Sequence, residues 1–102
     1  MLTVAKAEEL QKNLQGKLIP EKKARGITNR FILENLRDGF CAGTPTFVFV
    51  GEDPAWSVPV LFSQIKDENA EVGEVLIHAI QEVILGFTPP TEIFRNARQF
   101  VS

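Results

Sequence analysis

The sequence has few of the residues from which metal and catalytic sites are usually built. Its 102 residues include one cysteine, Cys41, and one histidine, His78. A single cysteine excludes a disulfide within the chain and a metal site made of paired thiolates. A single histidine excludes a metal motif with two imidazole ligands. Carboxylates are the remaining candidate metal ligands, and we expect neither a metal site nor a cofactor.

Long apolar segments are missing as well. No stretch approaches the roughly 18 consecutive apolar residues that a membrane-spanning helix needs. Residues 1–15 carry four charged side chains where a secretory signal peptide needs an uninterrupted apolar segment. Together with the lone cysteine, these absences predict a cytoplasmic protein with no membrane-spanning segment.

The short motifs of common enzyme classes do not occur. The glycines are scattered and form neither the dinucleotide-binding fingerprint nor the phosphate-binding loop with Gly-Lys-Ser/Thr. The nucleophile elbow Gly-x-Ser-x-Gly and the zinc-protease motif His-Glu-x-x-His are missing too. Catalysis is therefore the less favoured hypothesis, and we predict no catalytic residue from motifs.

The overall composition is typical of a folded globular protein. Hydrophobic residues make up 44% and charged residues 24% of the sequence, close to the globular average. A chain of this length buries one core but not two. We therefore predict a single domain over residues 1–102.

The N-terminal part is predicted to hold two helices. Apolar residues recur at spacings of three and four over residues 4–15, which indicates an amphipathic helix. Residues 16–26 contain Pro20, which would interrupt a continuing helix, and we expect a basic connection there. A second helix is predicted from Thr28 or Asn29, although its apolar run would also suit a buried strand.

A first β-hairpin is predicted after the helices. Residues 46–50 are rich in β-branched and aromatic residues, and the turn residues 51–54 follow. Apolar and other residues then alternate over residues 56–65, as in a strand with one buried face. Pro59 lacks the N–H of a ladder hydrogen bond, so we expect this strand to be an edge or to be bulged at that point.

A second hairpin and a last helix complete the predicted fold. Residues 72–80 and 82–88 favour two strands, with a turn at residues 79–82. After Pro89 and Pro90, apolar residues at helical spacing up to Val101 predict an amphipathic helix. The expected architecture is an α+β domain with N-terminal helices, a four-stranded antiparallel sheet of two hairpins, and a C-terminal helix.

Charge is divided unevenly along the chain. Residues 1–37 hold eight Lys or Arg against four Glu, a balance of +4, and residues 38–102 hold three against nine, a balance of −6. Oppositely charged parts attract each other within a chain or between chains. One hypothesis is a regulator that binds nucleic acid through basic N-terminal helices, with these candidates: Lys17, Lys22, Lys23, Arg25 and Arg30. Against it stands the acidic isoelectric point, because dedicated nucleic-acid domains are usually strongly basic.

The favoured hypothesis is an interaction or regulatory protein without catalysis. Both faces of the predicted first hairpin are apolar, and three helices would not cover both. Uncovered apolar sheet favours a partner surface, either a second copy of the chain or another protein. The interface candidates lie on the second strand of this hairpin: Trp56, Val58, Pro59, Val60 and Phe62.

A third hypothesis is a small enzyme that uses Cys41 or His78. A thiol nucleophile at Cys41 would need a base such as His78 nearby. Without such a partner, Cys41 is expected to be a small buried hydrophobic residue, and His78 a half-exposed residue near a hairpin turn.

The run Trp56-Ser57-Val58-Pro59-Val60, the run Glu71-Val72-Gly73-Glu74-Val75 and the short last helix resemble small uncharacterised bacterial α+β proteins. The resemblance covers roughly residues 45–101. It implies the fold class alone, since such proteins have no established activity to carry over to a residue here.

Overall fold

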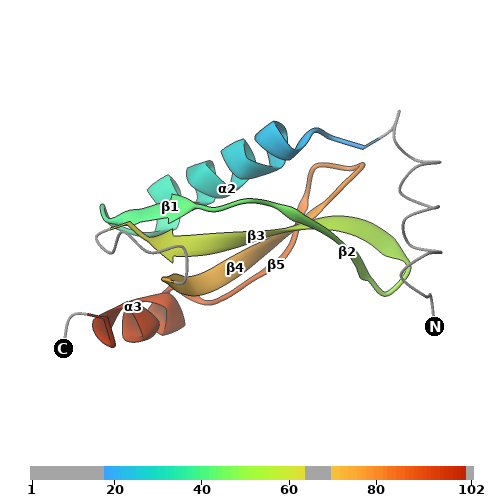
Figure 1. The fold of residues 1–102 in the computed structure, drawn as a ribbon. Coiled ribbons are helices and arrows are strands. Elements are labelled where there is room, and N and C mark those ends of the chain that lie inside the picture. The colour runs from blue at the N-terminus through green and yellow to red at the C-terminus, as the bar shows by residue number, and fades with distance from the viewer. Residues whose placement is uncertain (1–17, 64–69, 101–102) are drawn as a thin grey trace.

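The computed structural model describes residues 18–63 and 70–100 and shows an α+β fold (Figure 1). Its elements, in chain order, are helix α2 (Glu21–Asn35), strands β1 (Phe40–Ala42), β2 (Thr46–Val50), β3 (Asp53–Phe62), β4 (Glu71–His78) and β5 (Ile84–Phe87), and helix α3 (Pro90–Arg98). The fold class, both hairpins and the C-terminal helix are confirmed. The helix predicted over residues 4–15 lies outside the described residues. No helix in the described ranges is long and apolar enough to cross a membrane.

The sheet is antiparallel and has five strands rather than the four predicted. Strand β3 lies in its centre, with β1 and β2 paired along one side and β4 along the other, and β5 is the outermost strand beyond β4. The additional strand β1 was missed because three residues are too few to show a period. Figure 1 shows α2 along one face of the sheet and α3 at one end of it.

Helix α2 begins earlier than predicted. The expected basic connection over residues 16–26 is wrong for its second half, because the helix starts at Glu21, directly after Pro20. Proline blocks a helix interior, but at the first turn its missing N–H has no partner to lose. The Pro20 carbonyl oxygen accepts bonds from the amides of Lys23 and Ala24, at 3.0 and 3.1 Å.

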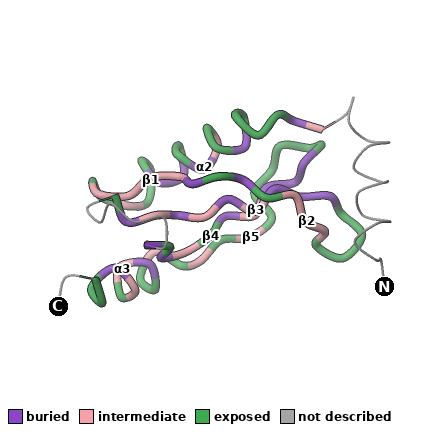
Figure 2. The backbone as a smooth tube through the Cα atoms, in the orientation of Figure 1, coloured by how far each residue is buried: buried purple, intermediate pink, exposed green. Residues whose placement is uncertain are grey.

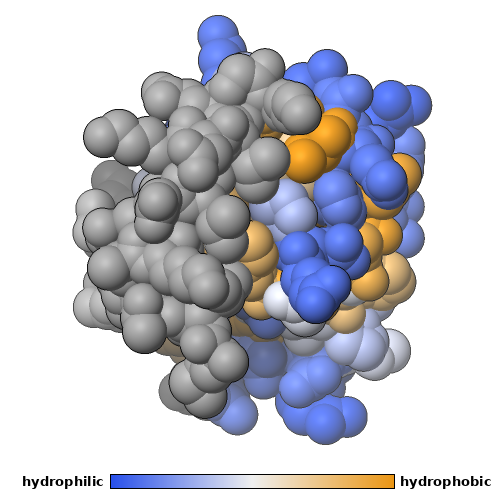
Figure 3. Space-filling view, turned by 90° about the vertical axis from the view of Figure 1, so that its right-hand side faces the viewer, coloured by the Kyte–Doolittle hydropathy of each residue, from blue (hydrophilic) through white to orange (hydrophobic). Residues whose placement is uncertain are grey.

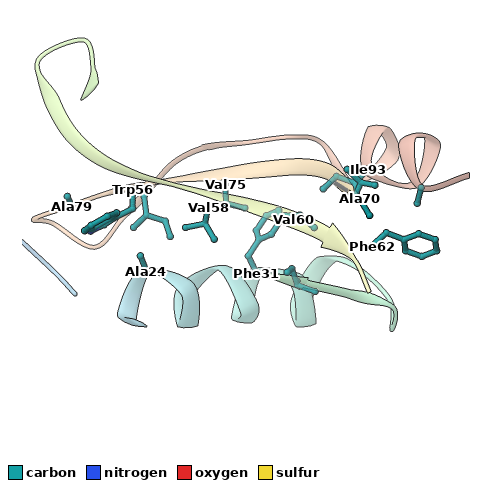
Figure 4. Close-up of a cluster of buried hydrophobic side chains, with 14 of the residues drawn as sticks. Ala24, Phe31, Trp56, Val58, Val60, Phe62, Ala70, Val75, Ala79 and Ile93 are labelled. Atoms are coloured by element: carbon teal, nitrogen blue, oxygen red, sulfur yellow. The ribbon is translucent and has the colours of Figure 1, made fainter. Parts of the chain in front are cut away.

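The core lies between α2 and the sheet. Alternate residues of β3 point toward the helix, as the period of a strand requires, and meet a helical stripe of apolar residues (Figure 4). The main contacts are made by Ala24, Phe31 and Ile32 of α2 and Trp56, Val58, Val60 and Phe62 of β3. Burying each of the larger side chains contributes on the order of 1.5–3 kcal/mol. This face of the sheet is therefore fully used by the chain itself.

Trp56 also fastens the segment before α2. Its indole Nε1 donates a buried hydrogen bond of 3.0 Å to the carbonyl oxygen of Ile19. The Ile19 amide in turn donates to the carbonyl oxygen of Ala79, at 2.8 Å, just after β4 ends. These two bonds attach the chain before α2 to the central strand and to the β4–β5 turn.

Pro59 lies in the central strand, so the expectation of an edge strand is wrong, and the alternative of a local irregularity is nearer to the structure. The Pro59 carbonyl oxygen accepts from the Gly43 amide at 2.8 Å, but Pro59 has no N–H to return. The Gly43 carbonyl oxygen instead accepts from Nε of Arg25, at 3.1 Å. Strands β1 and β2 both pair with β3, and the gap between these two strands lies opposite Pro59. A side chain of α2 thus satisfies the group that proline leaves unpaired.

We predict that Gly43→Ala destabilises the protein and that Gly26→Ala does not. A β-carbon at Gly43 would lie 2.7 Å from Cγ of Pro59, too close for ordinary contact, whereas at Gly26 it would meet nothing within 4 Å. Overpacking of this kind costs about 1–3 kcal/mol. Alanine in place of a helical glycine adds about 0.5–1 kcal/mol of stability. Urea unfolding of both variants measures the two free energies. Equal effects would show that the close contact at Gly43 is absent.

Candidate functional site

Four of the five sequence-predicted interface residues are core residues. Trp56, Val58, Val60 and Phe62 are at most 7% exposed beneath α2. Only Pro59, which points to the other side of β3, is partly exposed among the five. A change such as Trp56→Ala would therefore damage the core before it affected a partner surface. An interface of this chain has to use other residues.

The basic candidates of the nucleic-acid hypothesis are largely engaged within the chain. Lys17 lies outside the described residues, and Lys22 is exposed on α2. The other three make these contacts: Lys23 pairs with Glu82, Arg25 donates to the Gly43 carbonyl oxygen, and Arg30 pairs with Glu34 at 3.1 Å. The surface of α2 is therefore a mixture of both signs of charge rather than a uniform basic stripe.

Cys41 and His78 are not brought together. Cys41 pairs in register with Leu61, and His78 pairs with Ala55, six residues away along β3. At 3.2–3.4 Å per residue, this places them roughly 20 Å apart at opposite ends of the sheet. The Cys–His pair that a thiol enzyme would need is absent from the structure, and the two residues have separate surroundings.

His78 holds the β4–β5 turn. It is 7% exposed, so the expectation of a half-exposed residue is wrong, while its predicted place beside the turn is confirmed. Its Nδ1 accepts hydrogen bonds from the backbone amides of Ile80 and Gln81, both at 3.1 Å. An accepting Nδ1 carries no proton, which leaves the proton of the neutral ring on Nε2. Nε2 lies 3.7 Å from Oδ1 of Asp53, the first residue of β3.

Two further features shape the same turn. Glu82 has a backbone φ of 62°, in the left-handed region that glycine adopts at lower cost, and its carboxylate pairs with Lys23 of α2. Beyond it, the His78 amide donates to the Val83 carbonyl oxygen at 2.8 Å and begins the β4–β5 ladder. The turn thereby determines where β5 starts and how it lies against β4.

The longest run of exposed large apolar residues in the described part of the chain lies on the strand that this turn presents. We call residues 83–87 the β5 edge. Its large side chains are exposed to these extents: Val83 48%, Ile84 40%, Leu85 38% and Phe87 52%. Neither a charged residue nor a proline interrupts this run. In Figure 2 the strand and the turn before it carry mostly exposed and intermediate residues.

The β5 edge has one side along which no described strand pairs. Within residues 18–63 and 70–100, β5 is the last strand in the sheet order and hydrogen-bonds to β4 alone. The ladder slips by one residue between Leu76 and Ile77, which makes Leu85 the additional residue of a bulge. A bulge redirects a side chain and bends the strand, but it adds no charge to the edge. Natural proteins protect such edges with short strands, bulges, lysine, proline or a covering element; β5 is short and bulged but carries neither lysine nor proline.

Phe87 connects the β5 edge with the core. Its ring lies 5.0 Å, centre to centre, from the ring of Phe31 on α2, yet half of the residue is exposed. Ile80, 38% exposed, adds apolar surface at the turn. Figure 3 views the side toward which the β2–β3 and β4–β5 turns point and shows hydrophobic atoms at the surface among hydrophilic ones.

Acidic groups flank the far end of the β5 edge. Glu74 and Glu92 line a cavity of about 240 Å³ together with Thr88. Ser57 donates to the Glu74 carboxylate at 3.0 Å, and neither glutamate pairs with a lysine or arginine of the described chain. Of the carboxylates in the sequence, Glu8, Glu9, Asp67 and Glu68 lie outside the described residues. No group of three potential metal ligands occurs within residues 18–63 and 70–100.

A second cavity lies where α2 and α3 end. It measures about 270 Å³, below the usual range for sites of drug-sized ligands. The Arg37 guanidinium lies 4.8 Å from the ring centre of Phe94, which ties the end of α2 to α3. Asp38 and Arg98 add opposite charges to the lining. The arrangement is explained by packing between the two helix ends.

Comparison with known proteins gives no relative to this chain. No family model, no curated protein and no solved structure matches it. The candidate site is an apolar strand edge held in place by a histidine-capped turn.

We predict that His78→Asn keeps the β4–β5 turn and that His78→Gln does not. The side-chain oxygen of asparagine occupies nearly the position of Nδ1 and can accept the two amide bonds, whereas that of glutamine lies near the position of Nε2. Loss of both bonds costs roughly 1 kcal/mol, because water replaces them in part. Thermal unfolding compares the variants, and amide chemical shifts of Ile80 and Gln81 report the turn. Equal stability of the two variants would contradict the capping role.

Proposed function

We propose that the chain is a non-catalytic interaction protein that contacts another protein chain through the β5 edge. The observation that carries the proposal is the run of half-exposed apolar side chains on the outermost described strand, which pairs on one side with β4 and on the other with no described strand. An exposed edge binds an extended segment by backbone hydrogen bonds, and its side chains add apolar contact. The bound segment would become a sixth strand beside β5.

The rest of the described surface supports the same conclusion. The apolar face of β3 is used by α2. Two of the four basic residues of α2 pair with glutamates, and a third donates to a backbone carbonyl oxygen. Cys41 and His78 are far apart. Exposed apolar surface rimmed by polar residues is typical of protein contact sites. The β5 edge meets this description, with Glu82 before it and Glu92 after it.

The turn that His78 caps has a defined part in this function. Edge strands of four residues are short, and a frayed turn would let β5 separate from β4. The bonds from Ile80 and Gln81 to the imidazole, together with the Lys23–Glu82 pair, hold the beginning of β5 in place. A preordered edge loses less conformational freedom on binding than a mobile one.

We predict that a photo-crosslinking residue at position 85 gives protein adducts in cells and that the same residue at position 33 does not. Leu33 is a matched control, because it is a leucine, is 80% exposed and points into solvent from α2. The measurement is denaturing gel separation of the irradiated cells, followed by mass spectrometry of the adducts. Adducts at both positions alike, or at position 33 alone, would contradict a contact at the β5 edge.

A further inference from the structure

We infer that the partner at the β5 edge is an extended segment of a different protein that carries a lysine or an arginine, and that this basic side chain enters the cavity lined by Glu74 and Glu92. The inference rests on the proposed function and names the chemistry of the partner. Apolar side chains of the segment contact the β5 edge, and the basic side chain fixes the position of the segment along the strand.

The cavity lies beside the last residues of the β5 edge. Its volume is about 240 Å³, and its lining joins apolar and acidic groups: Glu74, Leu76, Phe87, Thr88 and Glu92. Phe87 belongs to the β5 edge and Thr88 directly follows it, so the cavity and the edge form one continuous surface. A lysine or arginine side chain has an apolar stem and a charged end, and this lining offers contacts to both.

Negative charge is left uncompensated at this end of the β5 edge. At the start of the edge, Lys23 and Glu82 neutralise each other. At its end, neither Glu74 nor Glu92 forms an ion pair with a lysine or arginine within residues 18–63 and 70–100. A cation brought by a partner complements these two carboxylates and disfavours partners with acidic residues at the same position.

Gly86 leaves a path from the outer side of β5 to the cavity. It pairs with Leu76, so the two positions face the same side of the sheet, and Leu76 lines the cavity. A β-carbon at Gly86 would meet no atom within 4 Å. The residue of an added strand that lies opposite Gly86 points to this side as well, and its side chain has room to pass over the glycine. Two strand spacings of about 4.8 Å separate the added strand from β4, which favours long side chains.

The backbone of β5 presents the groups that an added strand requires. The amide of Thr88 donates inward to the Glu74 carbonyl oxygen at 3.0 Å. Because successive residues of an antiparallel strand alternate between their two neighbours, the N–H and C=O of Phe87 point away from β4. The same holds for Ile84, because the carbonyl oxygen of Val83 before it accepts a bond from β4.

The strands of a second copy do not supply the basic side chain. None of the five described strands contains a lysine or an arginine. Pairing of two β5 strands would leave the carboxylates of Glu74 and Glu92 without a cation from either strand. The segment that fits both the apolar edge and the acidic cavity therefore belongs to a different protein.

The first test is selection of random peptides from a phage-displayed library on the purified full chain. We expect enriched peptides in which β-branched or aromatic residues surround one lysine or arginine. Basic residues should be at least about twofold more frequent in these peptides than in the unselected library. Enriched peptides without this excess, or no enriched peptide at all, overturn the inference.

A double-mutant cycle tests whether the basic residue binds in the cavity. Combined Glu74→Gln and Glu92→Gln substitutions should weaken an enriched synthetic peptide about threefold to fivefold, the range of a good exposed ion pair. Replacement of the basic residue of the peptide by glutamine should weaken it equally. With all changes together the loss should grow no further, because the same contact is removed from both sides. Fluorescence anisotropy of the labelled peptide measures the four affinities, and additive losses overturn the inference.

Glu71→Gln is the matched control for these substitutions. Glu71 is exposed at the start of the same strand and does not line the cavity, so its replacement removes a negative charge elsewhere on β4. The affinity of the peptide should stay within about twofold of the original. A loss as large as that of the cavity variant would show a general effect of charge and would overturn the inference.

The two proposals fail separately. If the crosslinker at position 85 captures a second copy, or captures a different protein equally well with and without the Glu74→Gln and Glu92→Gln substitutions, the cation inference is overturned and the interaction function stands. If position 85 captures nothing in cells and no peptide is enriched, both are overturned. Capture of a different protein that falls with the two substitutions, together with a non-additive cycle, supports both.

Discussion

The burial of one face of β3 under α2 determines most of this structure. Once Trp56, Val58 and Val60 are covered by the helix, the strand is central and the sheet has to grow on both sides of it. Arg25 compensates for the proline within that strand, and the Trp56 indole attaches the chain before the helix. What remains for contact with other molecules is the part that the helix does not reach, above all the outermost strand.

The outermost strand is placed by local chemistry rather than by the core. The imidazole of His78 accepts hydrogen bonds from two backbone amides of the β4–β5 turn. Asp53, at the start of β3, lies beside the ring. A group of this kind suggests catalysis when it is met in a sequence, because histidine is a frequent acid or base. The contacts assign it instead to holding a hairpin that presents an apolar edge.

Sequence patterns predicted the helices and strands better than they predicted which groups pack against each of them. Alternation along residues 56–62 correctly indicated a strand with one apolar face, and it could not tell whether a helix or a partner covers that face. Pro20 predicts that a helix is interrupted, but proline is also favoured in the first turn of a helix, and the structure has a helix start there. Pro59 indicated that the strand lacks one backbone N–H donor. The sequence did not indicate that Arg25 supplies a donor to the Gly43 carbonyl oxygen in its place, because these residues are distant from Pro59 in sequence. The uncharged run 83–87 was a visible signal for the β5 edge that the hairpin prediction did not use.

The most direct test of the account is amide hydrogen exchange along β5, measured on the purified protein at low concentration. Because successive residues of an antiparallel strand alternate between their two neighbours, the amides of Ile84 and Phe87 point away from β4 and should exchange rapidly. The Thr88 amide, bonded to the Glu74 carbonyl oxygen, is the internal reference and should be protected. Protection of Ile84 and Phe87 equal to that of Thr88 would contradict an open edge at this strand.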